Sequence, residues 1–246
     1  MNCMTDRVVA ITGASSGIGR ATAMTLAGHG ASLALAARGA ENLRSVAEEI
    51  KAAGGRVVTL PTDVSDRASV QAFVDSACAA FGRIDALINN AGIGPISPLD
   101  ALQVEDWDLM VDINLMGALN VLAAVLPVLR RQDGGHLVNV VSVAGLQGVS
   151  PRMAVYAATK NAVRTVGEGL RAEAGPNLRV TNVSPGFVKT NFAGSMSDPE
   201  VRAAIEARME EIGLSPEAVA NAILFAVSQP DSVEIGDITI RPSAQG

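Results

Sequence analysis

The chain of 246 residues contains little cysteine, histidine or aromatic side chain. It has two cysteines and two histidines, and aromatic residues make up 3% of the sequence. Cys3 and Cys78 have no CxxC spacing and no companions, so the sequence predicts neither a disulfide framework nor a zinc site, which suits a reducing compartment. His29 and His136 are isolated in the same way. We therefore expect no bound metal.

An excess of basic charge and a long hydrophobic run are also missing. The net charge of −6 argues against a nucleic-acid partner, which requires a basic face. The first residues lack the basic start, apolar stretch and cleavage site of a signal peptide. The most apolar stretch, GALNVLAAVLPVLRR at 117–131, contains Asn120 and Pro127 and is too short to span a bilayer, so it predicts a buried helix. We expect a soluble, cytoplasmic protein with no membrane partner.

What the sequence does contain is a regular alternation of two kinds of segment. Short, continuously apolar runs lie at 7–12, 32–37, 56–61, 84–89, 136–141, 178–183 and 234–240. Segments rich in Ala, Glu, Leu and Arg separate them, for example 41–54 and 66–82. Unbroken apolar runs are typical of strands covered on both faces, and their alternation with helices indicates βαβ units and a parallel sheet. We predict one α/β domain over 1–246, with the long segment 187–214 as a substrate lid.

Three glycines follow the first predicted strand, at the start of the first predicted helix. Gly13, Gly17 and Gly19 stand in the sequence TGASSGIG. Glycine allows the backbone to turn tightly and to approach a phosphate, which the free N–H groups of a helix N-terminus then bind. The spacing differs from the usual fingerprint, but its place at a strand-to-helix junction predicts a dinucleotide site.

The end of the second predicted strand bears on which dinucleotide is bound. NAD-binding folds usually carry an acidic residue there, which holds the ribose 2′-hydroxyl. Here Ala37 occupies that place and Arg38 follows it. An arginine pairs with a 2′-phosphate, so the sequence favours NADP over NAD. The alternative is that Arg38 is a solvated residue at a strand end.

Tyr156 is the only tyrosine of the chain, and Lys160 follows it by four residues. On a helix this spacing brings the two side chains together, either as an ordinary packing pair or as a chemical pair. In the second case we expect the ammonium group of Lys160 to lower the pKa of the Tyr156 phenol, because a nearby positive charge favours the phenolate.

Four motifs in order, TGASSGIG (12–19), NNAG (89–92), a serine at 142 and YAATK (156–160), resemble those of the short-chain dehydrogenase/reductase family. The resemblance runs from about Arg7 to the end of the chain. It implies a single Rossmann-fold domain with a doubly wound, seven-stranded parallel sheet and helices on both faces. It also implies a dimer or tetramer, with 118–131 and 154–174 as candidate interface helices.

The resemblance also implies roles for individual residues. Tyr156 matches the catalytic acid/base, and Lys160 the lysine that binds the nicotinamide ribose and lowers the tyrosine pKa. Ser142 matches the serine that hydrogen-bonds the substrate carbonyl, and Asn114 the asparagine that holds a water of the proton relay. The implied cofactor-binding residues are Gly13, Ser15, Ser16, Gly17, Ile18, Gly19, Arg38, Asp63, Val64, Asn90, Ala91, Gly92, Tyr156, Lys160, Pro185, Gly186, Val188 and Thr190.

The C-terminal sequence, VEIGDITIRPSAQG at 233–246, departs from the tail of the ketoacyl reductases. It is more similar to the branch that contains clavulanate dehydrogenase, which argues against a ketoacyl-carrier-protein substrate. The candidate pocket residues are Ile93, Gln147, Met153, Phe187, Phe192 and Met196. Arg152 and Lys189 are candidates to attract an anionic group, or are simply solvated.

The sequence therefore predicts an NADPH-dependent oxidoreductase that acts on a small or medium ketone or aldehyde, or on the corresponding alcohol. One alternative is a dehydrogenase that oxidises a hydroxy acid or a sugar alcohol with NAD or NADP. A third is a dinucleotide-sensing regulator without catalysis. The presence of Asn114, Ser142, Tyr156 and Lys160 argues against that third reading, because such a regulator normally shows damage to this set.

Overall fold

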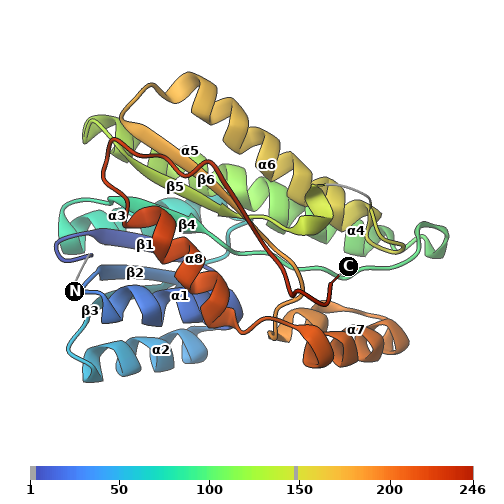
Figure 1. Ribbon diagram of the computed structural model, residues 1–246. Coiled ribbons are helices and arrows are strands. Elements are labelled where there is room, and N and C mark those ends of the chain that lie inside the picture. Colours follow the sequence, from blue (N-terminus) through green and yellow to red (C-terminus); the bar gives the residue numbers. More distant parts are fainter. Residues whose placement is uncertain (1–3, 147–148, 246) are drawn as a thin grey trace.

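The protein is described by a computed structural model that covers residues 4–146 and 149–245, and it is built around a seven-stranded parallel sheet (Figure 1). The strand order is β3-β2-β1-β4-β5-β6-β7. The strands are β1 (Val8–Thr12), β2 (Ser32–Ala37), β3 (Arg56–Pro61), β4 (Ala86–Asn89), β5 (Gly135–Val140), β6 (Leu178–Pro185) and β7 (Asp237–Ile240). Each lies within or closely overlaps one of the seven apolar runs, so the predicted α/β fold with a doubly wound parallel sheet is confirmed.

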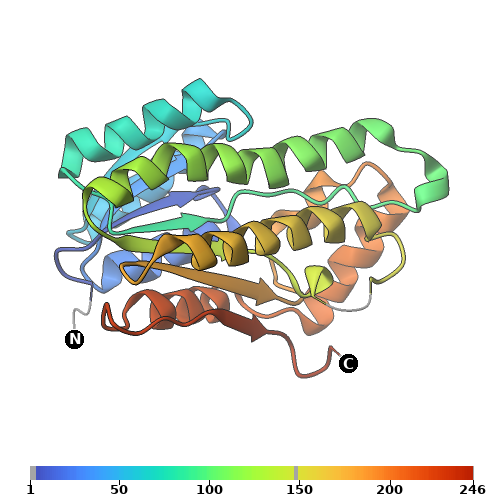
Figure 2. The same ribbon diagram turned by 90° about the horizontal axis from the view of Figure 1, so that it is seen from above.

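Helices cover both faces of the sheet. Figure 2 shows α3, α5 and α6 lying across the strands on one of these faces. The helices are α1 (Gly17–Gly28), α2 (Ala40–Ala52), α3 (Arg67–Phe81), α4 (Val104–Met110), α5 (Gly117–Arg131), α6 (Ala154–Ala174), α7 (Pro199–Ile212) and α8 (Pro216–Val227). Shorter turns are η1 (Leu99–Ala101), the π-helical η2 (Val111–Met116), η3 (Val143–Gly145) and η4 (Asn191–Ser195). One hydrophobic cluster joins the strands to α1, α2 and α8, and a second joins them to α3, α5 and α6.

The two clusters explain why the strand sequences do not alternate between apolar and polar residues. In β2, Leu33 and Leu35 pack in the cluster with α1, and Ala34 and Ala36 pack in the cluster with α3. Every residue of β1 and β2 is buried, whereas the edge strands β3 and β7 are partly exposed. Burial on both faces therefore produces the continuous apolar runs of the central strands.

The helix that contains residues 117–131 is longer than the sequence predicts. The segments α4, η2 and α5 form one helix of 28 residues, Val104–Arg131, with Pro127 inside it. By length and composition this helix could cross a membrane, so the expectation that the stretch is too short is wrong. Val121 and Val125 on its inner face are fully buried, and α5 packs against α3 and the sheet. That inner face belongs to the protein core, as predicted.

The strand order places the candidate site. The chain moves from β1 to β2 and β3 on one side, and then returns to place β4 on the other side of β1. The loops that follow β1 and β4 therefore diverge at the carboxyl edge of the sheet, which is where open α/β sheets bind ligands.

Cys78 is a free thiol, and Cys3 lies outside the described residues. Within the part of the chain that the structure describes, no group of three or more His, Cys, Asp or Glu side chains is arranged so that it could hold a metal ion.

Candidate active site

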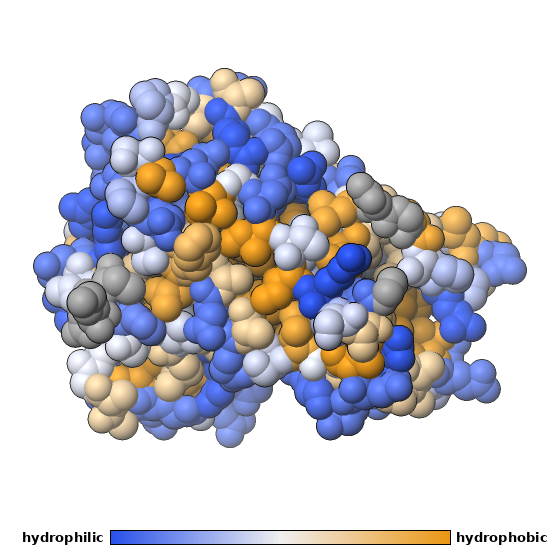
Figure 3. Space-filling model, viewed as in Figure 1, coloured by the Kyte–Doolittle hydropathy of each residue, from blue (hydrophilic) through white to orange (hydrophobic). Residues whose placement is uncertain are grey.

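A large cleft opens at the carboxyl ends of the strands, with a volume of about 1450 Å³. Its walls come from the loops after β1, β2, β3, β4, β5 and β6, from the beginning of α6 and from η4 and α7. In the space-filling view the outline of the molecule is notched between the α1–α2 side and α7 (Figure 3). The glycine loop and Tyr156 both line this cleft.

The glycine loop between β1 and α1 leaves space and free donors for a phosphate. Gly13 and Gly17 have φ angles of 65° and 50°, a left-handed backbone that favours glycine. A Cβ atom at Gly19 would lie 2.2 Å from the carbonyl oxygen of Gly13, so the loop folds this tightly only with glycine there. Ser16 precedes α1, and its side chain does not cap the helix. The first N–H groups of α1 are therefore free to bind an anion.

Asn90 and Thr12 tie the glycine loop to the end of β4. The Asn90 amide donates to the carbonyl oxygens of Thr12 (2.9 Å) and Gly13 (3.2 Å). In return, Thr12 Oγ1 accepts hydrogen bonds from the backbone N–H groups of Asn90 (3.0 Å) and Ala91 (3.1 Å). Thr12 is fully buried, and no role of its own is predicted for it from the sequence. The only sequence feature that could have indicated this role is that Thr12 is the first residue of the motif TGASSGIG.

Most of the residues predicted to bind a cofactor line this one cleft. They are Gly13, Ser15, Ser16, Gly17, Ile18, Arg38, Asp63, Val64, Asn90, Ala91, Gly92, Tyr156, Lys160, Pro185, Gly186, Val188 and Thr190, and the catalytic candidate Ser142 joins them. Among the predicted cofactor-binding and catalytic residues, two do not line it. Gly19 lies behind the loop against Gly13, and Asn114 lies beneath Gly92 and Ile93. Phe187 and Gln245 line the cleft, although neither was predicted to bind the cofactor.

The end of β2 carries no carboxylate. Ala37 is buried there, and the exposed Arg38 follows it at the cleft wall. The nearby carboxylate is that of Asp63, which accepts hydrogen bonds from the hydroxyl (2.7 Å) and N–H (3.0 Å) of Ser65. These bonds lower the pKa of Asp63, and the charge of Arg38 lowers it further. This end of the cleft thus presents one arginine and one ionised carboxylate.

Tyr156 and Lys160 lie on α6, four residues apart as predicted, and both are buried. Burial raises the pKa of Tyr156 to about 12, and a hydrogen bond with Ser142 offsets only part of that rise. The expectation that Lys160 lowers the tyrosine pKa is therefore wrong for this structure. Lys160 Nζ donates to the carbonyl oxygen of Val140 at 3.0 Å, and burial lowers the pKa of Lys160 to about 8. Removal from water outweighs any attraction between the two groups.

Asn114 lies in the π-helical turn η2, and the backbone after β4 occupies its amide. Asn114 Oδ1 accepts from the N–H of Ile93 (2.8 Å), and Nδ2 donates to the carbonyl oxygen of Ile93 (2.9 Å) and to Thr159 Oγ1 (3.1 Å). A Cβ atom at Gly92 would lie 3.0 Å from Lys160 Nζ and 3.2 Å from Asn114 Oδ1. Asn114 and Lys160 are thus near neighbours beside Gly92, and a water between them stays a prediction.

The segment 187–214, predicted as a lid, supplies η4 and α7 to the far wall of the cleft. Of the predicted pocket residues, Ile93, Met153, Phe187 and Phe192 line the cleft. Met196 does not, because it is fully buried in a third hydrophobic cluster under η4 and α7. Gln147 lies outside the described residues.

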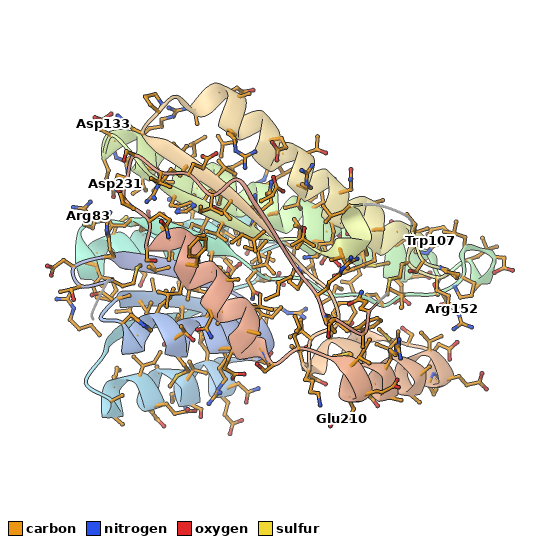
Figure 4. The ribbon with its side chains drawn as sticks, viewed as in Figure 1. Arg83, Trp107, Asp133, Arg152, Glu210 and Asp231 are labelled. Carbon is orange, nitrogen blue, oxygen red and sulfur yellow. The ribbon has the colours of Figure 1, made fainter. Side chains whose placement is uncertain are left out.

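The two cationic candidates at this end of the cleft differ. Lys189 does not line the cleft and pairs instead with Glu210 (3.1 Å), which lies on the outer side of α7 (Figure 4). Arg152 does line the cleft, and Figure 4 places it between the beginning of α6 and α7. Arg152 is therefore the better candidate for contact with an anionic group.

The model of the short chain dehydrogenase family matches residues 7–201 of this chain. The chain belongs to that family. An uncharacterized oxidoreductase of Listeria monocytogenes is 41% identical over 243 residues, which cover 98% of each chain. This membership confirms the resemblance given by the four motifs, and it makes the protein an oxidoreductase of the short-chain dehydrogenase type.

Solved structures of short-chain dehydrogenases agree with this fold over almost the whole chain. The alcohol dehydrogenase from the archaeon Thermococcus sibiricus, complexed with 5-hydroxy-NADP, is 32% identical with a TM-score of 0.87, and the match covers 98% of each chain. A short chain dehydrogenase/reductase from Burkholderia phymatum, in complex with NAD, is 31% identical with a TM-score of 0.85, covering 97% of this chain and 90% of that one. Structural relatives of this protein thus bind both kinds of nicotinamide dinucleotide.

Proposed function

We propose that this short-chain dehydrogenase reduces a small or medium ketone or aldehyde with NADPH, and that Tyr156 is its proton donor. The observation that carries the proposal is that Ser142 and Tyr156 line the same cleft, with Lys160 one helical turn from Tyr156. Two hydroxyl groups that converge in this way can both donate to one carbonyl oxygen and stabilise the negative charge that develops on it.

The cleft fits a nicotinamide dinucleotide. The glycine loop and the N-terminus of α1 would hold the diphosphate, and Asp63 and Val64 would flank the adenine. Arg38, with Ala37 in place of an acidic residue, supports a cofactor with a 2′-phosphate, because the guanidinium group pairs with phosphate. The archaeal alcohol dehydrogenase was solved with an NADP derivative, and the Burkholderia relative with NAD, so the preference for NADP rests on Ala37 and Arg38.

The cofactor, when bound, supplies a hydride to the carbonyl carbon of the substrate. Tyr156 has a pKa of about 12 and is therefore protonated at neutral pH. The phenol gives its proton to the carbonyl oxygen as charge builds there, and Ser142 donates a hydrogen bond to the same atom. Lys160, next to Asn114, returns a proton toward Tyr156. The product is the secondary or primary alcohol.

The oxidative direction, from a hydroxy acid or sugar alcohol with NAD or NADP, uses the same residues in reverse. The direction is set by the ratio of reduced to oxidised cofactor, because a catalyst accelerates both directions alike. A dinucleotide-sensing regulator without catalysis is a weaker candidate, because Ser142, Tyr156 and Lys160 are assembled in one place. We further propose a cytoplasmic homodimer or homotetramer that uses α5 and α6 as interface helices.

The test is to follow NADPH absorbance with a panel of ketones and aldehydes, for the natural chain and for Tyr156→Phe. We expect Tyr156→Phe to bind NADPH with unchanged affinity and to lose turnover by roughly 10²- to 10⁴-fold, the usual contribution of a general acid. NADPH binding is measured separately by fluorescence titration. Undiminished turnover in Tyr156→Phe would remove this residue from its role. A natural chain that binds NADPH and reduces nothing on the panel would leave two interpretations, a substrate outside the panel or the regulator.

A further inference from the structure

The last residues of the described chain fold back onto the cleft. After β7, the N–H of Gln245 donates to the carbonyl oxygen of Pro242 (3.0 Å), which closes a turn. The end of the chain thereby lies near the segment that follows β6 (Figures 1 and 2). Before the turn, the N–H of Gly186 donates to the carbonyl oxygen of Ile240 (2.8 Å), so β7 and the turn are attached to the same short segment.

Gln245 contacts that segment through its side chain. Gln245 Oε1 accepts a hydrogen bond from the backbone N–H of Phe187 at 2.9 Å. A Cβ atom at Gly186 would lie 2.1 Å from the same oxygen, so the amide fits against the backbone only because residue 186 is glycine. The match between Gly186 and Gln245 joins two positions that are 59 residues apart in the printed sequence.

Phe187 is held from two sides. Its N–H donates to Gln245, and its carbonyl oxygen accepts from the N–H of Leu214 (2.9 Å), where the segment 187–214 ends. The N–H of Lys189 donates in turn to the carbonyl oxygen of Leu214 (2.9 Å). The backbone of residues 186–189 is therefore fixed between the end of the chain and the end of the lid. Gly186, Phe187 and Gln245 all line the cleft.

We propose that Gln245 is a positioning residue for the nicotinamide end of the cofactor. The inference rests on the proposed function, in which the segment from Pro185 to Thr190 contacts that end. Without the acceptor oxygen of Gln245, the N–H of Phe187 loses its partner, and the 186–189 backbone keeps three of the four hydrogen bonds described above. The nicotinamide is then held less firmly, while the adenosine end, at Arg38 and Asp63, is bound as before.

Two variants of Gln245 separate the acceptor from the rest of the side chain. Gln245→Met keeps the length and removes the acceptor, and Gln245→Glu keeps an acceptor oxygen. We expect Gln245→Met to weaken NADPH binding about fivefold to tenfold, the effect of one lost hydrogen bond, and Gln245→Glu to restore most of it. Adenosine 2′,5′-bisphosphate, which carries only the adenosine end, should bind equally to all three chains. Both affinities are measured by calorimetric titration, with the thermal midpoint recorded for each chain.

Gln132→Met is the matched control. Gln132 also bonds the backbone, accepting from the N–H of Ile84 (3.0 Å) and donating to its carbonyl oxygen (2.7 Å), but it does not line the cleft. This variant should lower the thermal midpoint and leave NADPH affinity unchanged. The inference is overturned if Gln245→Met binds NADPH like the natural chain, or if it loses affinity for adenosine 2′,5′-bisphosphate to the same degree. A natural chain that fails to bind NADPH would overturn the proposed function itself.

Discussion

The ring of Phe192 stands edge-on to the ring of Tyr156, with centroids 5.4 Å apart and an angle of 65° between the planes. Phe192 belongs to η4, so this contact places the segment 187–214 directly against the candidate catalytic tyrosine. The tip of the phenylalanine ring contacts Gly94, where a Cβ atom would lie 2.0 Å from Phe192 Cζ. The N–H of Gly94 also donates to Ser195 Oγ (3.1 Å). Phe192 therefore fills the space between Tyr156 and the loop after β4.

Removing the Phe192 ring should widen the substrate range. We expect Phe192→Ala to raise kcat/KM for a bulky aryl ketone relative to acetone by about tenfold, because a pocket contact of this size contributes on the order of 1–3 kcal/mol to discrimination. The ratio of the two kcat/KM values is the measurement. Phe225→Ala, on the exposed surface of α8 with 53% of the residue accessible, is the control and should leave the ratio unchanged. An unchanged ratio in Phe192→Ala would show that this ring does not limit substrate size.

The fit of Phe192 against Gly94 shows where the sequence stops being informative. The strands could be predicted because burial on both faces of the sheet requires apolar side chains at consecutive positions. The glycine loop could be predicted because its residues directly follow one strand and begin one helix. Phe192 and Gly94, like Gln245 and Gly186, are far apart in the chain, and only the folded backbone reveals how closely they pack. The raised pKa of Tyr156 likewise depends on burial by elements that are distant in the chain. The four-residue spacing between Tyr156 and Lys160 contains no information about that burial.

Arg38 should decide between the two dinucleotides. Its guanidinium group is exposed at the end of β2 with no carboxylate at residue 37, so we expect Arg38→Leu to weaken NADPH binding about 10- to 100-fold, as for a lost hydrogen bond between charged groups. NADH has no 2′-phosphate, and its affinity should stay within a factor of two, roughly the scatter of surface substitutions. Arg44→Leu, on the exposed face of α2, is the control. Equal losses for NADPH and NADH would contradict a 2′-phosphate contact.

A row of buried asparagines crosses the sheet beneath α6. Asn89, Asn139 and Asn182 lie opposite one another on β4, β5 and β6, joined by hydrogen bonds of 3.4 Å and 3.2 Å. Asn139→Leu would leave the amides of its two neighbours without this partner inside the core. We expect a loss of about 2–4 kcal/mol in the free energy of unfolding, measured in urea. Asn177→Leu, which removes an exposed hydrogen bond to Asp133, should change the free energy of unfolding by less than about 0.5 kcal/mol. Equal effects would contradict the cost assigned to burial.

Lys160 should reduce stability at neutral pH while serving catalysis. Burial lowers its pKa to about 8, whereas an unfolded lysine has a pKa of about 10.5. Between these values the unfolded chain binds more protons than the native one, so this group makes the free energy of unfolding rise with pH from about 8 to about 10.5. Below that window the native state carries the whole cost of a buried ammonium group, about 3 kcal/mol at 1.36 kcal/mol per pKa unit.

Lys160→Met removes that cost together with the hydrogen bond to the carbonyl oxygen of Val140, which contributes about 1 kcal/mol. We therefore expect Lys160→Met to be the more stable chain at pH 7, by about 1–2 kcal/mol in urea unfolding without cofactor. The advantage should disappear at pH 10.5, where the natural lysine is neutral in the native state, and turnover should be lost at every pH. Lys51→Met, at an exposed position of α2, is the control. A natural chain that is more stable than Lys160→Met at pH 7 would mean that the ammonium group is satisfied where it lies, because attraction to its surroundings would then exceed the cost of burial.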